Sequence, residues 1–250
     1  MASDTIAIFN YLLAPPDGSR PYNRVYADSA TGKPARNWVE DPHDMPVEDV
    51  RGKEELYKLD NAGFQYGREA SKFTSFLNDD EIEREYYPES IDLIRRVTGA
   101  TKIVIFDHTI RRRRPGEWIT LTRRNVNPSP GFAQTQTPAA SIGRVHRHLP
   151  PTEAPSLLRR RFQIINLWRP ISHAAKDFVP VAHIYPDREG ETFGVKYNPN
   201  HQWKYMKAMT PEEYVLIKCS DSIQDGSTPN TPEGTPPRES IELRALVFYD

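Results

Sequence analysis

The chain has 250 residues, of which 37% are hydrophobic and 27% are charged, and its formal net charge is −1. This length favours one well-buried domain, so we expect residues 1–250 to form a single unit. The nearly neutral charge excludes an overall electrostatic attraction to nucleic acid or anionic lipid. No apolar run approaches the roughly 18 residues that a membrane span requires. Cys219 is the single cysteine, which excludes an intramolecular disulfide and makes the cytoplasm the expected compartment.

The chain contains 23 prolines, which must cut it into many short elements. Proline cannot donate a hydrogen bond in a sheet or sit inside a helix, so this punctuation favours a mainly β fold. We expect residues 1–100 to supply loops and helices that pack on a barrel, and residues 101–250 to form the barrel core. Residues 222–237 are rich in proline, serine and threonine, and they are predicted to form a mobile loop or lid.

A helical region is predicted over residues 79–100. Asp79 or Asp80 fits its N-cap, Pro88 interrupts it and Gly99 ends it. The strand TKIVIFDHT follows. The basic block RRRR after that strand is interpreted as a solvated loop instead of a nucleic-acid patch, because no aromatic residues are interleaved with it.

A second helix is predicted between Thr137, which fits the N-cap, and Pro150. Pro138 suits the first helical position. The apolar residues recur at helical spacing: Ile142, Val145 and Leu149. His146 and His148 point away from this stripe, and their spacing of two does not suit a metal pair on a helix, so we expect both at the surface.

From residue 161 the hydrophobic pattern changes to period two, which predicts strands. The segment RFQIINLWR places four residues on one face: Phe162, Ile164, Asn166 and Trp168. The segment ESIELRALVFY likewise places Ser240, Arg244, Leu246 and Phe248 on one face, and Arg238 enters on the same parity. An arginine that faces the inside of a barrel is costly without a partner, so it indicates an anionic ligand or an ion pair. The segments VAHIY, TFGVKYN and YVLIKCS read as further strands.

Four segments together resemble a known family: RRRFQIINLWRPI, YPDREGETFGVKYNPNHQWKYMKAMTPEEYVLIKCSDS, PPRESIELRALVFY and FDHTIRRR. The family comprises fungal and bacterial non-haem iron, 2-oxoglutarate-type hydroxylases and desaturases, including a cephalosporin 7-methoxylation component and gibberellin-desaturase-like proteins. The resemblance runs from about residue 103 to the C-terminus. It implies a mainly β fold, the jelly-roll or cupin-like double-stranded β-helix with flanking helices, and a possible homodimer.

The resemblance also implies an iron site made of two histidines and one carboxylate. In this family a His-x-Asp motif precedes the Thr-Pro helix start, where this chain has Ala133, Gln134 and Thr135. None of the seven histidines is followed two positions later by Asp or Glu. Asn230 stands where the third ligand is expected. We therefore predict that no metal and no cofactor is bound, with Fe(II) and 2-oxoglutarate as the alternative.

One motif of the family is retained. Arg238 and Ser240 match the Arg-x-Ser pair with which relatives hold the far carboxylate of 2-oxoglutarate. The pair either still binds a carboxylate or persists as part of a structural ion pair.

Three functions are compatible with these observations. The first is a metal-independent enzyme of fungal natural-product biosynthesis, a pericyclase of the Diels–Alderase kind, which cyclises or isomerises a polyunsaturated terpenoid or polyketide, possibly a carboxylic acid, in a repurposed oxygenase pocket. The second is a non-catalytic protein that binds a metabolite. The third is an active Fe(II)/2-oxoglutarate-dependent hydroxylase or desaturase with unusual ligands drawn from His108, His183 or His201.

Nine residues are candidates for the site. The catalytic candidates are Asn166, Arg169, His108 and Tyr197, and the substrate-binding candidates are Trp168, Phe162, Arg238, Ser240 and Arg244. Asn166 is the expected hydrogen-bond donor to a carbonyl and Trp168 a packing wall. Each also has a structural reading: Trp168 as core, His108 as a hydrogen-bonded structural histidine, and Tyr197 as the brace of a turn.

Overall fold

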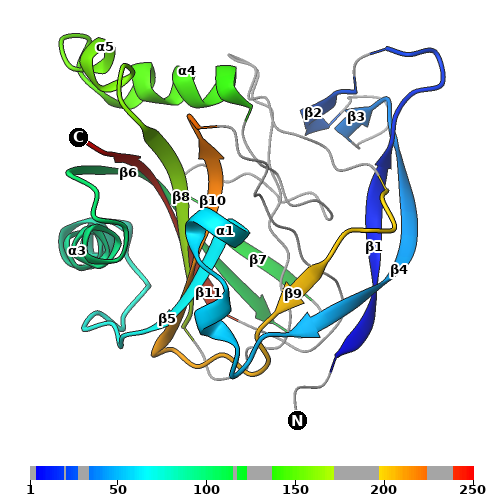
Figure 1. The fold of residues 1–250 in the computed structure, drawn as a ribbon, viewed down its shortest axis with the longest axis horizontal. Helices are drawn as coiled ribbons and strands as arrows, with labels where there is room; N and C mark the ends of the chain where they lie inside the picture. The colour runs from blue at the N-terminus through cyan, green and yellow to red at the C-terminus, as the bar shows by residue number, and fades with distance from the viewer. Residues whose placement is uncertain are drawn as a thin grey trace.

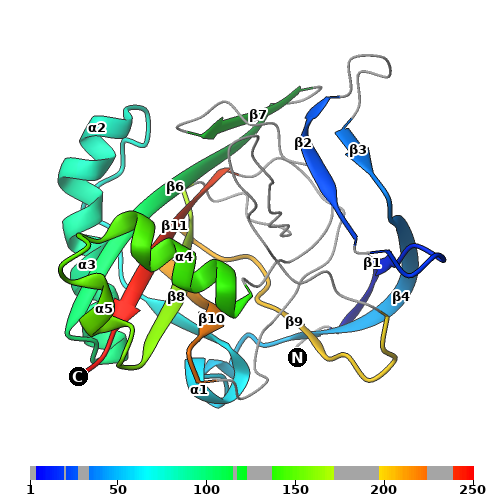
Figure 2. The ribbon, with the colours of Figure 1, turned by 90° about the horizontal axis from the view of Figure 1, so that it is seen from above.

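The computed structural model of the chain describes residues 4–19, 21–27, 34–114, 117–122, 137–171, 197–223 and 239–250. Their strands form a six-stranded sheet, a three-stranded sheet and a two-stranded hairpin. In Figures 1 and 2 the small sheet lies on one side of the large sheet and α3 (Tyr87–Thr98) lies on the other. The side of the large sheet that faces away from α3 is called the inner face below. The predicted mainly β architecture is confirmed.

The large sheet is antiparallel throughout. In spatial order its strands are β5 (Phe64–Arg68), β10 (Glu213–Asp221), β8 (Phe162–Pro170), β11 (Glu239–Phe248), β6 (Lys102–Arg114) and β7 (Glu117–Thr122). The small sheet contains β1 (Thr5–Leu13), β4 (Val39–Asp49) and β9 (Trp203–Tyr205), and the hairpin contains β2 (Asn23–Ala27) and β3 (Pro34–Arg36). The basic block that was expected in a loop therefore belongs to the end of β6.

The predicted division at residue 100 does not hold. β5 is an edge strand of the large sheet, and β1 and β4 make up most of the small sheet. β4 was not recognised as a strand because it contains Pro42 and Pro46. β9 pairs with β4 only at Val47–Asp49, so β4 is an open edge beside both prolines in the described structure, and prolines are tolerated on such an edge.

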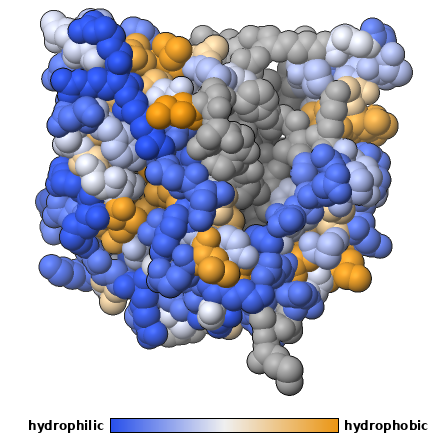
Figure 3. Space-filling view, in the orientation of Figure 1, coloured by the Kyte–Doolittle hydropathy of each residue, from blue (hydrophilic) through white to orange (hydrophobic). Residues whose placement is uncertain are grey.

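The outer face of the small sheet has no covering layer among the described residues. Ile6 is 72% exposed and Ile8 is 55% exposed on β1. Figure 3 shows hydrophobic patches along this edge of the molecule beside a largely hydrophilic surface.

The helices are short, apart from α3 and α4 (Pro138–His148). The others are the 3₁₀ turn η1 (Glu54–Leu56), α1 (Leu59–Ala62), α2 (Asp79–Glu81), the π-helical turn η2 (Ile82–Tyr86) and α5 (Ala154–Leu157). Within the part of the chain that the structure describes, no helix is long and apolar enough to cross a membrane.

The helical region predicted over residues 79–100 is present, but its start and its interruption differ from the prediction. Asn78 is the N-cap, because its side-chain oxygen accepts hydrogen bonds from the backbone N–H groups of Asp80 and Glu81 at 2.9 and 3.2 Å. Pro88 does not break the helix, since the π-helical turn η2 precedes it. Such a widened turn accommodates a residue that lacks an N–H and crowds the carbonyl four positions earlier. Gly99 ends the helix at φ 72, as predicted.

The helix predicted after Thr137 is confirmed. Thr137 accepts a hydrogen bond from the N–H of Ala140 at 3.3 Å, and the helix ends before Pro150. Val145 is fully buried, whereas Ile142, which was expected in the same stripe, is 43% exposed. His146 is exposed as expected, but His148 stacks on Phe106 with their ring centroids 4.8 Å apart.

β8 is the central element of the core, and all nine of its residues are buried. Ile165 and Leu167 pack toward α3 in one hydrophobic cluster. On the inner face, Phe162 and Ile164 pack under α4, while Trp168 packs against Met206 and Met209 at the other end of the strand. The predicted shared face of Phe162, Ile164, Asn166 and Trp168 is therefore confirmed. It leaves a middle region of the inner face between two apolar clusters.

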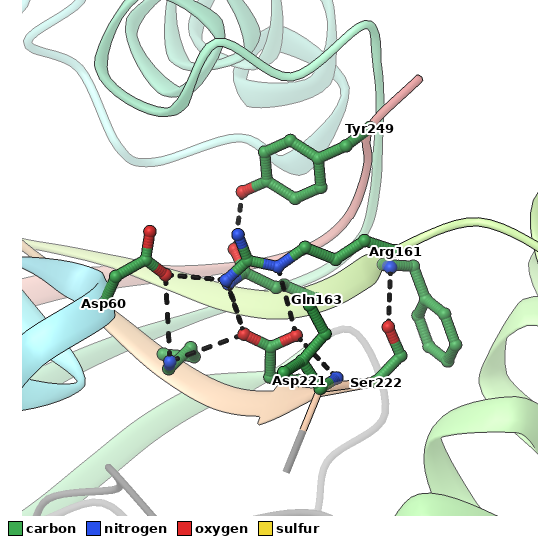
Figure 4. Close-up of polar contacts among 9 residues, drawn as sticks. Asp60, Arg161, Gln163, Asp221, Ser222 and Tyr249 are labelled. Carbon is green, nitrogen blue, oxygen red and sulfur yellow. Dashed lines mark hydrogen bonds and ion pairs between the residues drawn. The ribbon is translucent and has the colours of Figure 1, made fainter. Parts of the chain in front are cut away.

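A charge cluster around the buried Asp221 joins α1, β8 and β10 at one end of the large sheet (Figure 4). Arg161 donates to Asp221 at 2.8 Å and to Asp60 at 2.6 Å, and Gln163 donates to Asp221 at 2.7 Å. Burial alone would raise the pKa of Asp221, but the hydrogen bonds from Arg161 and Gln163 outweigh it and hold that pKa below its ordinary value. The Asp221 carboxylate therefore ties three elements together in its ionised form.

We predict that Asp221→Asn lowers the free energy of unfolding at pH 7 by about 3 kcal/mol, because it leaves Arg161 without its buried partner. A lowered folded-state pKa stabilises above the unfolded-state pKa, and this contribution is lost as the pH falls through the folded-state pKa. The difference between variant and wild type should therefore shrink in acid. Urea unfolding at pH 7 and below pH 4 measures it.

Asp250→Asn is the matched control, because Asp250 pairs with Arg160 at an exposed site. We expect a change of at most about 1 kcal/mol for that exposed pair. Equal losses in the two variants would contradict the assigned role of Asp221.

Candidate functional site

A chain of four polar side chains crosses the middle of the inner face. Asn166 on β8 donates from Nδ2 to Oε1 of Glu242 on β11 at 3.0 Å. Arg244 donates from Nη2 to the same oxygen at 2.9 Å and from Nη1 to Oδ2 of Asp107 on β6 at 2.7 Å. Asn166 and Glu242 are 9% and 4% exposed. Three adjacent strands therefore supply one connected and mostly buried polar chain.

A β-bulge in β6 makes this chain possible. Arg244 lies opposite Asp107, but the next residue of β11, Ala245, lies opposite Ile105, so Phe106 is the extra residue. An extra residue reverses which side chains of a strand face each way. As a result, Phe106 and Asp107 both face the inner side although they are consecutive residues.

Two buried polar atoms on the inner face have no hydrogen-bond partner among the described residues. They are Oδ1 of Asn166 and Oγ of Ser240. The orientation of the Asn166 amide is fixed, because the ionised Glu242 only accepts hydrogen bonds and must face the NH₂ group. Leaving such a group unpaired costs about 1–3 kcal/mol, so these atoms are the positions where a ligand would gain most.

The separation of these two atoms follows from the strand register. Asn166 pairs with Arg244, and Ser240 pairs with Pro170, four residues further along β8. At about 3.3 Å per residue, the two positions lie about 13 Å apart along the strands. A ligand that contacts both is therefore larger than a simple diacid.

Arg244 stays in its ionised form. Burial would lower the pKa of Arg244, but Glu242 and Asp107 more than compensate, so its pKa is raised above its ordinary value. The pKa of Cys219 on β10 is also raised, to about 12, by burial and then by the charge of Glu242. For a thiol this favours the neutral form. The site therefore offers hydrogen bonds and fixed charge, and its thiol is not a nucleophile.

Five of the predicted site residues share the inner face: Phe162, Asn166, Trp168, Ser240 and Arg244. The ion pair predicted as one possible partner for an inward arginine is present at Arg244. Their proposed catalytic or binding roles stay predictions.

Arg169 and His108 do not join this group, because they face α3 on the opposite side of the sheet. Arg169 alternates with Asn166 and Trp168 along β8, and the bulge turns His108 outward. Nδ1 of His108 lies 2.8 Å from the hydroxyl of Tyr87, and Nε2 lies 3.2 Å from Asp79. His108 is thus a buried structural histidine in this arrangement.

Tyr197 lies beside the small sheet, where its ring stacks on His43 with centroids 3.5 Å apart. His201 is nearby, with Nδ1 3.3 Å from the Tyr11 hydroxyl. The structure therefore does not bring Tyr197 to the Asn166 chain. Several predicted positions lie outside the described residues: Ala133, Gln134, Thr135, His183, Asn230, Arg238 and nearly all of the predicted lid.

Glu242 and Asp107 are the residues that sequence reasoning missed. Glu242 has the same strand parity as Ser240 and Arg244, so the period-two rule alone would have placed it on the inner face. The orientation of Asp107 depends on the β-bulge, and the sequence FDHT contains no signal that predicts a bulge. Without these two carboxylates the partner of Arg244 could not be named.

Comparisons with known proteins identify relatives of the whole chain. A family model described as Oxidoreductase/YMDC permease-like domain matches residues 9–248. Hydroxylase/desaturase efuI of Hormonema carpetanum is 29% identical over 249 residues, 82% of this chain and 83% of that protein. Fe(II)/2-oxoglutarate-dependent dioxygenase nvfI of Aspergillus novofumigatus is 26% identical, covering 91% of this chain and 90% of that protein. A solved structure of iron and alpha-ketoglutarate-dependent endoperoxidase NvfI matches with TM-score 0.78 at 24% identity, over 98% of this chain and 97% of that chain.

These findings confirm the predicted resemblance and the predicted jelly-roll-like fold with flanking helices. They contradict the prediction that no cofactor is used, because the relatives are named for their dependence on iron and 2-oxoglutarate. The names of these relatives thus correct an inference that rested on motif positions alone.

The described residues do not fit an iron-ligand set. No three side chains of His, Cys, Asp or Glu gather in the part of the chain that the structure describes. The two inner-face carboxylates, Glu242 and Asp107, are both bound to Arg244. Because their charge is already used by a guanidinium, they are poor ligands for a divalent cation.

Cys219 gives a direct test of this description of the inner face. With a pKa of about 12, its thiolate fraction at pH 8 is on the order of 10⁻⁴. We expect the native protein to resist iodoacetamide at pH 8, whereas the protein unfolded in urea should take up one alkyl group per chain. Intact mass spectrometry measures both. Rapid stoichiometric labelling of the native protein would show that the strand face around Cys219 is open.

Proposed function

Because the chain belongs to the Oxidoreductase/YMDC permease-like domain family, we propose that it is an enzyme of fungal natural-product biosynthesis whose small-molecule substrate binds against the inner face of the large sheet. One observation carries this proposal. Oδ1 of Asn166 and Oγ of Ser240 are buried on that face without a partner among the described residues. The partners we expect are a small molecule and, as a continuing prediction, a second copy of the chain.

Asn166 is the positioning group for the substrate. Glu242 holds its amide, Arg244 holds Glu242, and Asp107 holds Arg244. This succession fixes Oδ1 as an acceptor before the substrate arrives, which reduces the cost of orienting the substrate. The matching substrate group is a hydroxyl or an N–H, because Oδ1 can only accept.

Ser240 is the second contact. Its hydroxyl can donate to a carbonyl or carboxylate of the substrate, or accept from a second hydroxyl. Trp168 and Ile217 supply apolar surface on the same face of the neighbouring strands. A terpenoid or polyketide that carries oxygen at two separated positions satisfies all of these groups.

The reaction that we propose first is an oxidation of the hydroxylase or desaturase type, because relatives that cover most of the chain bear those names. The second candidate is ring closure or isomerisation of the same substrate, as in a pericyclase of the Diels–Alderase kind. One observation keeps the second candidate in consideration: the sequence contains no His-x-Asp or His-x-Glu, and the described inner-face carboxylates are bound to Arg244. There the Ser240 hydroxyl would polarise a substrate carbonyl while Asn166 holds the rest of the molecule in shape.

Turnover of 2-oxoglutarate separates the two candidates. We expect the full chain, incubated with Fe(II), 2-oxoglutarate and oxygen, to form succinate above the level of a protein-free control if it is an oxygenase. The measurement is succinate by mass spectrometry, with an anaerobic sample as the control. No succinate above background would contradict the oxidation and leave the redox-neutral candidate.

Ser240→Ala tests the site without a known substrate. Removing an unpaired buried hydroxyl should leave the free energy of unfolding unchanged or raise it by up to about 1 kcal/mol. The matched control is Ser141→Ala, because Ser141 Oγ is bonded to the Thr137 carbonyl at 3.0 Å and to Ser220 Oγ at 2.7 Å. We expect that control to lose roughly 1–2 kcal/mol.

Urea unfolding of both variants gives the comparison. If Ser240→Ala loses as much as Ser141→Ala, the Ser240 hydroxyl has a partner within the protein and is not reserved for a ligand.

A further inference from the structure

A small cavity lies on the opposite side of the large sheet from Asn166. It opens between α3, the segment that follows β5 and the end of β8, and its volume is about 100 Å³. Seven polar residues line it: Glu69, Lys72, Glu89, Ser90, Asp92, Arg96 and Arg169. A volume of this size holds a few water molecules, since each water occupies roughly 30 Å³ in the liquid, or one small ion.

Arg169 lies in the wall of this cavity and is only 3% exposed. Its guanidinium is fixed by neutral groups alone. Nη1 donates to the backbone carbonyls of Glu69 at 2.6 Å and Pro211 at 2.9 Å, and Nε donates to the hydroxyl of Tyr86 at 3.3 Å. The remaining nitrogen, Nη2, has no partner among the described residues. A buried cation normally has an anionic partner, because its desolvation is costly.

The carboxylates around the cavity are already engaged. Glu69 accepts from Arg96 at 2.6 and 2.8 Å, and Asp92 accepts from Arg95 at 2.9 Å. Glu89 accepts from the hydroxyl of Ser71 and from the backbone N–H of Lys72, the latter at 3.0 Å. No described carboxylate lies within ion-pair distance of Arg169 or of the Lys72 ammonium. Arg169 and Lys72 are therefore two cations of the lining that have no ion-pair partner among the described residues, against one carboxylate, Glu89, that accepts only from neutral groups.

We propose that this cavity binds a small oxyanion, a phosphate or a short carboxylate, between Arg169 and Lys72. The remaining Nη2 of Arg169 can donate to an oxyanion, and the Lys72 ammonium supplies a second charge from the rim. The cavity is too small for the substrate of the inner face, from which the sheet separates it. This anion site is independent of the proposed catalytic function.

A purely structural role explains only part of the arrangement. As a clamp, Arg169 joins the segment after β5 to the turn before β10, and it lies over the Tyr214 ring at 5.7 Å. That clamp uses Nε and Nη1. It does not use Nη2, and it does not require Lys72 or the open volume beside them. A bound anion would complete the clamp, which predicts that it stabilises the fold.

The test is a titration of the full chain with inorganic phosphate and, separately, with malonate, at constant ionic strength set by chloride. Binding is followed by isothermal titration calorimetry and by the shift in melting temperature, because a ligand specific to the folded state raises that temperature. We expect saturable binding of at least one anion. Phosphate alone, malonate alone or both would identify which oxyanion chemistry the cavity accepts.

Lys72→Met is the variant of choice, since Lys72 is exposed and its loss should not affect folding. We expect it to weaken anion binding by tenfold or more. Lys58→Met is the matched control, because it removes the same charge from an exposed lysine on another element that pairs with Glu55, and it should bind as the wild type does. Absence of saturable binding for both anions, or equal binding by Lys72→Met and wild type, would overturn the proposal.

Discussion

The extra residue in β6 decides which chemistry shares the inner face of the large sheet. Up to the bulge the strand turns Val104 and Phe106 inward, and after it the strand turns Asp107 inward and His108 outward. Arg244 is paired from both sides only because Asp107 has this orientation. Without the bulge, Arg244 would share Glu242 alone, and an imidazole would face the middle of the sheet. One insertion thus replaces a histidine by a carboxylate at the centre of the molecule.

Buried charged side chains lie on both faces of the large sheet, but their hydrogen-bond partners differ. On the inner face Arg244 lies between two carboxylates, so one negative charge remains in excess along the Asn166 chain. On the outer face Arg169 contacts neutral groups only. Because β8 carries Asn166 and Arg169 on opposite faces, one strand presents a polar acceptor on the inner face and a cation to the cavity on the other side of the sheet. The large sheet lies between these two groups.

Much of the local structure could be predicted from the sequence. The Thr137 cap, the Gly99 stop and the face of β8 all follow from propensity and period, since each depends on residues close in the chain. The failures depend on distant partners. β4 and β5 could not be recognised because β4 contains prolines that only an open edge tolerates, and β5 is defined by its pairing with β10.

The candidate site could likewise be predicted from the sequence only in part. Strand parity predicted that Asn166, Ser240 and Arg244 share a face, and it would have given Glu242 as well. It could not give Asp107 or exclude His108, because a bulge is a feature of pairing between strands. Nor could it show that Arg169, adjacent to Trp168, belongs to the other side of the sheet in a cavity of its own.

The names of the relatives and the donor groups of this chain favour different reactions. The relatives use iron and 2-oxoglutarate in the same fold, whereas the described inner face has its carboxylates committed to a guanidinium. What the two have in common is a barrel face that positions a small molecule. The unpaired atoms of Asn166 and Ser240, about 13 Å apart along the strands, set the length of that molecule if it contacts both. A single 2-oxoglutarate is too short to contact both, so at most one of these atoms belongs to a 2-oxoglutarate subsite and the other is left for the substrate.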